Sequence, residues 1–349
     1  ASLRLAWGAR PPWVCRFEPG LARARCFEPH GVPAGAELVP VAEDDAAPTT
    51  LLRVVFTQDT PAGVYRAEDG ERVADDWKLP AFVRDDGSIL EVAPVHAASV
   101  LRRGDAEIGL LIPGNASTSA LAGDAVVWTD NDRLATRVVG HDGSLGPIVD
   151  LGPLPSGEHS IAMCRARRTL VVRVATGDRA TTVFRSGLAW SAPVESPRAD
   201  RPGALACDDD RATLTWIDHR TVHQIACTPR LCTSEAAILD PAWDVAEPDR
   251  DVVALGDHVL AMRRATFPSV LDARPGEAVV ARFAPLAQLV GAKDRVLVAD
   301  AAHGGIDVGR IQAFARDGVA AVVLTARDGT AWPLRVGREG DVKAVAVAR

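Results

Sequence analysis

Short apolar stretches separated by polar turn residues follow one another along most of the chain. The clearest series lies within residues 203–239, where Asp, Arg and Pro residues interrupt four such stretches. These stretches are residues 203–207, 212–217, 221–227 and 232–239. Runs of this length between turn signals predict β-strands joined by hairpins. Residues 160–194 repeat the pattern, so each region predicts one four-stranded antiparallel unit.

The four-strand unit recurs at a nearly fixed interval. Pro153, Pro197 and Pro241 are separated by 44 residues in each case, and each ends a similar segment. Trp128 and Trp216 are 88 residues apart, twice that interval, and both stand in a Trp-x-Asp step on an apolar strand. An internal repeat of this length defines the whole fold. We expect Trp128 and Trp216 to pack between neighbouring units.

Turns at the predicted hairpin tips occur about once per 50 residues, which is typical of β-propellers. The tips are His30–Gly31, Asp86–Gly87, Asp142–Gly143, Ser186–Gly187, Pro229–Arg230, residues 284–288 and Glu339–Gly340. Small sheets expose apolar faces that only neighbouring sheets can cover. The sequence therefore predicts an all-β fold, a single β-propeller domain over residues 1–349 with seven four-stranded blades. Residues 50–118 contain more apolar stretches than one blade needs, so six or eight blades also fit.

Two cysteine pairs coincide with predicted hairpins. Cys227 and Cys232 flank a four-residue tip, while Cys15 and Cys26 lie symmetrically about a turn at Gly20–Leu21. An antiparallel hairpin would place the members of each pair opposite one another, within reach of a disulfide.

Cys164 and Cys207 occupy matching places on the first strands of consecutive units. They are either a disulfide across two blades or two small core residues. Disulfides persist in oxidising compartments, so the hairpin coincidences favour a secreted or periplasmic protein whose signal peptide has been removed. Free thiols at all six positions would instead favour the cytosol. The predominance of Arg over Lys, which occurs only three times, is typical of a GC-rich bacterial genome.

Charge and hydropathy exclude two classes of partner. The formal net charge is -7 and the pI is about 5.7, so we expect no nucleic-acid binding. The longest apolar run, residues 318–326, is about half of what a transmembrane helix needs. We expect no transmembrane segment and interpret this run as a buried strand.

Several tips resemble the Ser-x-Asp-x-Gly-x-x-Trp turn of the Asp-box family of β-propellers, which includes sialidases and lectin-like proteins. Residues 185–190 (Arg-Ser-Gly-Leu-Ala-Trp) lack the Asp, and residues 327–332 (Arg-Asp-Gly-Thr-Ala-Trp) lack the Ser. The turns at 85–88 and 141–144 lack the Trp. The resemblance implies a propeller fold, and it transfers no functional residue to this chain.

The sequence contains no recognisable catalytic or metal-binding constellation. A sialidase-type enzyme needs a tyrosine nucleophile, and Tyr65 is the only tyrosine. His219 and His223 flank a turn between strands, where their spacing does not make them converge on a metal as it would on a helix. The acidic runs at 130–132 and 208–210 fit turns better than calcium loops. We therefore predict no cofactor and no metal.

These features favour a non-enzymatic propeller that works outside the cytoplasm as a protein-binding or assembly scaffold. Trp190 and Trp332 adjoin hairpin tips and are the best candidates for surface binding. Two alternatives stay open. The first is a carbohydrate-binding lectin that uses the Trp-bearing tips, and the second is a glycosidase or sialidase-like enzyme.

Overall fold

The computed structural model is an almost entirely β-stranded protein. Its described part contains 34 strands and two short 3-10 helices, η1 (Pro241–Trp243) and η2 (Leu286–Gly291). The structure describes residues 2–6, 13–17, 23–27, 37–40, 42–43, 51–55, 63–74, 81–83, 89–95, 98–103, 106–113, 118–130, 132–140, 142–166, 169–199, 203–208, 210–246, 249–267, 276–299, 308–316, 319–326, 331–337, 339–344 and 346–348.

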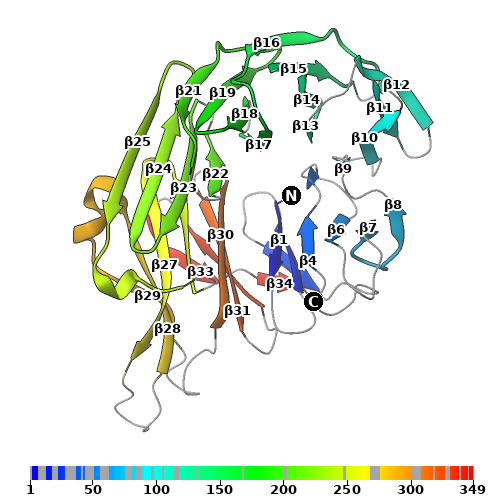
Figure 1. The fold of residues 1–349 in the computed structure, drawn as a ribbon. Coiled ribbons are helices and arrows are strands. Elements are labelled where there is room, and N and C mark those ends of the chain that lie inside the picture. The colour runs from blue at the N-terminus through cyan, green and yellow to red at the C-terminus, as the bar shows by residue number, and fades with distance from the viewer. Residues whose placement is uncertain are drawn as a thin grey trace. The chain divides into compact units, whose positions relative to one another are not determined.

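The described strands form eight sheets, of which six have four strands and two have five. Consecutive strands are antiparallel neighbours within most sheets, which is the organisation of β-propeller blades (Figure 1). The fold is therefore a β-propeller, as predicted. The predicted count of seven blades is wrong, because six sheets have the four-stranded form.

The four-stranded sheets contain β1 (Ser2–Ala6), β2 (Trp13–Phe17), β3 (Arg23–Phe27) and β34 (Ala346–Ala348); β4 (Glu37–Pro40), β6 (Leu51–Val55), β7 (Gly63–Arg66) and β8 (Arg72–Ala74); β13 (Thr118–Ala122), β14 (Ala125–Asp130), β15 (Arg133–Val138) and β16 (Val149–Pro153); β22 (Ala204–Cys207), β23 (Ala212–Asp218), β24 (Thr221–Cys227) and β25 (Cys232–Ile238); β26 (Arg250–Leu255), β27 (His258–Phe267), β28 (Gly276–Pro285) and β29 (Arg295–Ala299); and β30 (Val308–Arg316), β31 (Val319–Ala326), β32 (Ala331–Val336) and β33 (Val342–Ala344).

The five-stranded sheets contain β12 (Ala106–Pro113), β11 (Ala98–Arg103), β10 (Ile89–Val95), β9 (Ala81–Val83) and β5 (Ala42–Glu43); and β17 (His159–Arg165), β18 (Thr169–Thr176), β19 (Arg179–Ser186), β20 (Ala189–Trp190) and β21 (Val194–Pro197).

The chain divides into two compact units. The first comprises residues 1–3, 29–198 and 228–231, and the second comprises residues 4–28, 199–227 and 232–349. Within the first unit, Trp128 is buried in a cluster with Phe82, Leu121 and Val126. Within the second, Trp243 is fully buried among residues of β24–β28, η1 and η2. Trp128 and Trp216 are both buried, and Trp128 packs against Phe82 of another sheet, as predicted.

β31 shows how the sequence builds a core on both sides of one strand. Ala320, Val322 and Leu324 face one apolar cluster, and Ala321 and Val323 face another. All five residues are completely buried. Because successive side chains of a strand point to opposite faces, an uninterrupted apolar run is what a strand packed on both faces requires. The described part of the predicted run, Val319–Ala326, is thus a buried strand, as predicted. No helix of the described residues is long and apolar enough to span a membrane.

Five predicted tips lie where a third strand turns into a fourth, at residues 142–143, 186–187, 229–230, 284–288 and 339–340. The tips at His30–Gly31 and Asp86–Gly87 lie outside the described residues. The sequence pattern was misread between residues 37 and 113, which hold a four-stranded sheet (β4, β6–β8) and all five strands of the first five-stranded sheet, whose strand β5 precedes β6 in the chain. Several of these strands are only two to five residues long, so their pattern is too short to separate two sheets by sequence.

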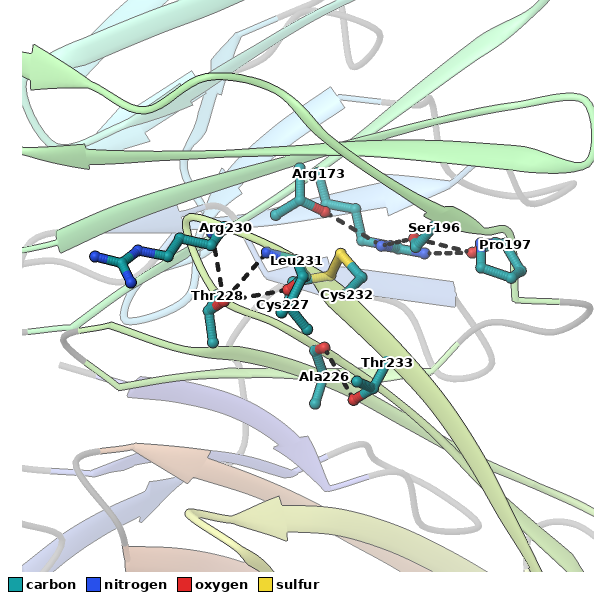
Figure 2. Close-up of a disulfide and its surroundings, with 11 residues drawn as sticks. Arg173, Ser196, Pro197, Ala226, Cys227, Thr228, Arg230, Leu231, Cys232 and Thr233 are labelled. Carbon is teal, nitrogen blue, oxygen red and sulfur yellow. Dashed lines mark hydrogen bonds between the residues drawn. A yellow bond between two sulfur atoms is a disulfide. The ribbon is translucent and has the colours of Figure 1, made fainter.

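The hairpin of β24 and β25 contains the predicted disulfide between Cys227 and Cys232 (Figure 2). The tip between them is closed by a hydrogen bond from Thr228 N–H to the Leu231 carbonyl (2.9 Å). Cys15 lies directly opposite Cys26 in the register of β2 and β3. Cys15, Cys164 and Cys207 are also disulfide-bonded, and none of the described cysteines is free.

Candidate binding surface

The tip between β19 and β20 presents an exposed leucine on a tightly held turn. Ser186 pairs with Ala189 and Arg185 with Trp190, which leaves Gly187 and Leu188 as the two turn residues. Gly187 has a φ of 59°, a backbone conformation that glycine adopts without the steric cost of a side chain. Leu188 is 83% exposed. The tip therefore projects a large apolar side chain into solvent.

Ser191 fixes the strand that returns from this turn. Its N–H donates to the Phe184 carbonyl (2.7 Å), and its hydroxyl accepts a hydrogen bond from the Phe184 N–H (3.0 Å). The same hydroxyl donates to the Ala192 carbonyl (2.9 Å). Trp190 packs against the apolar cluster of the first unit that contains Leu134 and Val172. The two strands below Leu188 are thus anchored to the core.

Arg185 connects this tip to the neighbouring turn at Asp124. Its Nε donates to the Gly187 carbonyl (2.8 Å), and its Nη2 donates to Oδ2 of Asp124 (2.5 Å). The guanidinium carbon lies 6.0 Å from the centroid of the Trp190 ring, at the outer limit of cation–π attraction. The Arg185 side chain is only 8% exposed. These contacts hold Trp190 and the turn in one arrangement.

Burial of Asp124 opposes its ionisation, but the hydrogen bond and charge of Arg185, with the nearby charge of Arg165, outweigh burial. The pKa of Asp124 is therefore below its usual value, and the pair is ionic at neutral pH. We call Asp124, Arg185, Leu188 and Trp190 the tip surface. It combines an exposed leucine with a half-buried tryptophan, a residue type enriched at protein interfaces, and the buried Arg185 supports both from within the chain.

Trp332, the second predicted surface tryptophan, lies in β32 of the second unit and is 42% exposed. It pairs in register with the fully buried Leu324. The turn that precedes it, residues 327–330, lies outside the described residues. Trp190 and Trp332 therefore belong to different compact units, and no shared site is assigned to them.

The sequence analysis missed a buried cluster around Trp243. The guanidinium carbons of Arg263 and Arg282 lie 5.3 and 5.2 Å from the centroid of its ring. Arg282 donates from Nε to Asp294 (2.6 Å) and from Nη2 to Asp240, while Arg263 donates to the other oxygen of Asp294 (3.1 Å). Trp243 is completely buried, so this cluster braces the second unit and presents no open binding surface.

The residues considered for catalysis or metal binding are either buried or close to a neighbouring side chain. Tyr65, the one tyrosine that a sialidase-type mechanism could use, is 6% exposed in β7. His223 stacks on Trp216 with 4.8 Å between ring centroids. His219, in the turn before β24, has its Nδ1 3.3 Å from Asp244. Across the described residues, no group of three or more His, Cys, Asp or Glu side chains is arranged to hold a metal ion.

Comparison with known proteins gives no family. No protein-family model matches the chain, and no curated protein matches it either. Solved structures resemble it weakly. One is a dihydro-heme d1 dehydrogenase NirN, with 14% identity, 96% of this chain and 73% of that chain covered, and a TM-score of 0.47. Another is a neuraminidase-like protein of subtype N10 from a bat influenza A strain, with 10% identity, coverage of 73% and 91%, and a TM-score of 0.37.

A third is the Aleuria aurantia lectin, with 10% identity, coverage of 91% and 97%, and a TM-score of 0.34. These three proteins have different functions, and none of them gives a function to this chain. The site residues of this chain must therefore carry the functional argument alone.

Proposed function

We propose that the chain is a non-enzymatic β-propeller, one domain over residues 1–349, that binds a protein partner outside the cytoplasm through the tip surface. The exposure of Leu188 carries this proposal. Leu188 is 83% exposed. Burying a complete leucine side chain at an interface favours binding by roughly 1.5 to 3 kcal/mol.

The surroundings of Leu188 support the same proposal. Because Arg185 bonds to the Gly187 carbonyl and to Asp124, the backbone of the turn is held before binding, which lowers the entropy cost of ordering this loop on binding. Binding-energy hot spots are enriched in Trp. The half-buried Trp190, two residues from Leu188, supplies such a residue beside the anchor. The disulfide-bonded cysteines agree with an oxidising compartment.

The experiment starts from the oxidised wild-type protein and its Leu188→Asp variant. The wild type is immobilised and offered the secreted and periplasmic proteins of the source cells, and a protein that it retains and the bare matrix does not is purified. Its affinity for both forms is then measured by calorimetry. We expect Leu188→Asp to weaken binding by more than about tenfold, because a charge replaces the buried anchor.

Val290→Asp is the matched control, because Val290 is a half-exposed apolar residue of the second unit and outside the tip surface. We expect its affinity to equal that of the wild type. Equal affinity of the Leu188→Asp variant, or chemical turnover of the retained molecule, would contradict the proposal.

A lectin is the second candidate, because the half-buried Trp190 ring beside Arg185 could stack on a sugar. A glycan array distinguishes the two functions. Glycan binding that is lost in Trp190→Ala and kept in Leu188→Asp would favour the lectin over the protein-binding scaffold.

A further inference from the structure

The last strand of one sheet, β25, has an open hydrogen-bonding edge. β25 pairs with β24 over all seven of its residues without a register shift. No other described strand pairs with it, and it ends its sheet in the order β22-β23-β24-β25 (Figure 1). η2 also contacts β25, in the apolar cluster that contains Ala237. The backbone groups of β25 that point away from β24 pair with no described strand, and such groups can pair with an added strand.

The register shows which peptide groups these are. Thr228 N–H bonds to the Leu231 carbonyl, and Leu239 N–H bonds to the Arg220 carbonyl, at the two ends of the hairpin. Hydrogen-bonded pairs alternate with non-hydrogen-bonded pairs along an antiparallel ladder. Odd-numbered residues of β25 therefore bond to β24. The N–H and C=O groups of Ser234, Ala236 and Ile238 face away from it.

Several other sheet-ending strands of the described chain have features that discourage strand addition. Short edge strands, register shifts, prolines and charged residues all oppose pairing with a further strand. The strands with these features are β5 (two residues), β8 (three, with a register shift), β12 (two register shifts, ending in Pro113), β16 (a register shift, ending in Pro153), β21 (four, ending in Pro197), β29 (a register shift, with Arg295), β33 (three, with Lys343) and β34 (three).

β25 has none of these protections except one charge. Its sequence is Cys-Thr-Ser-Glu-Ala-Ala-Ile, with Glu235 as its only charged residue and no proline. Residues 233–236 are exposed, and Ile238 is 59% exposed. Among the strands that begin a sheet, β13 lies against β17, and β22 and β26 lie against β30. Small, uncharged side chains allow the close approach of another backbone, so the chemistry of this edge fits an extended strand.

We propose that β25 pairs antiparallel with β25 of a second copy of this chain, about a two-fold axis at Ala236. Ser234 then faces Ile238 of the second copy, and Glu235 faces Ala237. A register centred on Glu235 would set two carboxylates directly opposite one another, which is destabilising. Glu235 therefore favours the register centred on Ala236 over the register centred on Glu235.

Charge at the two ends of β25 also favours a second copy. The exposed Arg230 precedes the strand and the exposed Asp244 follows it, whereas Asp240 is already paired with Arg282 within the chain. An antiparallel two-fold pairing brings the basic end of each copy to the acidic end of the other. Because a two-fold axis relates the copies, each such interaction forms twice in the dimer. Strand addition in this form is independent of the tip surface proposed above.

The test measures the mass of the oxidised protein by sedimentation velocity from micromolar to submillimolar concentration. We expect a reversible dimer. Ala236→Pro removes an N–H that makes no bond to β24, so the hairpin tolerates it and dimerisation is lost. Ala236→Ser keeps the N–H and is the matched control, with the wild-type dissociation constant. Peptide mapping of the Cys227–Cys232 bond confirms that the hairpin of each variant has folded.

Ser234→Lys is a second test variant, for use if Ala236→Pro fails to fold. A lysine on an edge strand opposes pairing with another strand and leaves the backbone unaltered. We expect it to weaken dimerisation by about tenfold or more. Site-resolved amide exchange should show Ser234, Ala236 and Ile238 slowing only at dimer-forming concentrations. Thr233, Glu235 and Ala237 should exchange slowly at every concentration.

A single-chain mass over the whole concentration range would overturn the proposal. A dimer that survives in folded Ala236→Pro and Ser234→Lys would overturn it as well, because its interface would lie elsewhere. Leu188→Asp should leave the dimer intact. Its effect on partner affinity separates failure of the tip surface from failure of the β25 interface.

Discussion

Cys227 and Cys232 face one another across β24 and β25, with 4.0 Å between their Cα atoms. This short separation belongs to the non-hydrogen-bonded type of antiparallel pair, and the hydrogen bond from Thr228 to Leu231 supplies the adjacent bonded pair. The disulfide therefore fixes the register of the hairpin. The same register turns alternate peptide groups of β25 outward.

Removing this disulfide should cost stability without changing the fold. The bond closes a loop with a sequence separation of 5 residues, and a loop this short contributes about 2 kcal/mol by the chain-entropy model. We expect Cys227→Ala/Cys232→Ala to lower the free energy of unfolding in urea by about that amount, with an unchanged far-UV spectrum. Equal stability of the double variant and the wild type would show that the bond does not constrain the hairpin.

Arg282 should be among the most sensitive positions of the second unit. It is 9% exposed at the side chain, contacts both Asp240 and Asp294, and lies beside the Trp243 ring. Removing one partner of a buried ion pair leaves the other charge uncompensated. Because both aspartates are partly exposed, we expect Arg282→Met to destabilise the protein by about 2 to 4 kcal/mol, measured by urea unfolding.

Arg179→Met is the control for this substitution. Arg179 forms an ion pair with Glu195 in which both side chains are about two-thirds exposed. Surface pairs of this kind contribute roughly 0 to 1 kcal/mol. A loss of stability in Arg179→Met as large as that in Arg282→Met would contradict the role assigned to the Trp243 cluster.

Stability should fall in acid through carboxylates paired with arginine. Burial opposes ionisation of Asp240, but hydrogen bonds from Arg282 and the Ala242 N–H outweigh burial and hold its pKa below the usual value. A carboxyl whose pKa is lower in the folded state stabilises the protein above its unfolded pKa, which is about 3.9. That contribution is lost as the pH falls below this value through the folded pKa.

We therefore expect the free energy of unfolding to decrease between about pH 5 and about pH 2. Asp240→Asn should make this decrease smaller, because it removes one of the groups with a lowered pKa. The measurement is urea unfolding at several pH values for both proteins. An equally steep pH dependence in Asp240→Asn would exclude Asp240 as a contributor.

Substitutions of Leu188 and Trp190 in the tip surface should have different effects on stability, because Leu188 is exposed and Trp190 supports the turn. Leu188→Ala removes a side chain that is almost entirely in solvent, so its stability should change by no more than about 0.5 kcal/mol. Trp190→Ala removes a ring that packs against a core cluster and lies near Arg185. We expect a loss of about 1 to 3 kcal/mol. Thermal unfolding of the two variants compares them directly, and the opposite order would contradict the geometry of the tip.

The local features of the fold were predictable because neighbouring residues determine them. The Cys227–Cys232 hairpin needed only a four-residue tip and two apolar strands, and the burial of Trp128 and Trp216 followed from their apolar neighbours. The blade count failed at residues 37–113, where short strands form parts of two sheets. Strand length there is too small for the alternation of residues to show which sheet a strand joins.

The Trp243 cluster could not be predicted because its members come from distant segments. Asp240, Arg263, Arg282 and Asp294 belong to different strands or turns and meet only after the second unit has folded. Trp243 also departs from the repeat, since it stands in a 3-10 turn after a fourth strand. Trp190 was predictable as a tip residue, whereas the role of Arg185 depends on Asp124, which is 61 residues away.

The central claim is a propeller whose hairpins are fixed by disulfides, and peptide mapping of the six cysteines under non-reducing conditions tests it most directly. The account predicts the bonds Cys227–Cys232 and Cys15–Cys26, with Cys164 bonded to Cys207 and no free thiol. The first two would confirm the registers of β24 with β25 and of β2 with β3. Free thiols at Cys227 and Cys232, or exchange of partners between these pairs, would contradict both registers and the extracytoplasmic location.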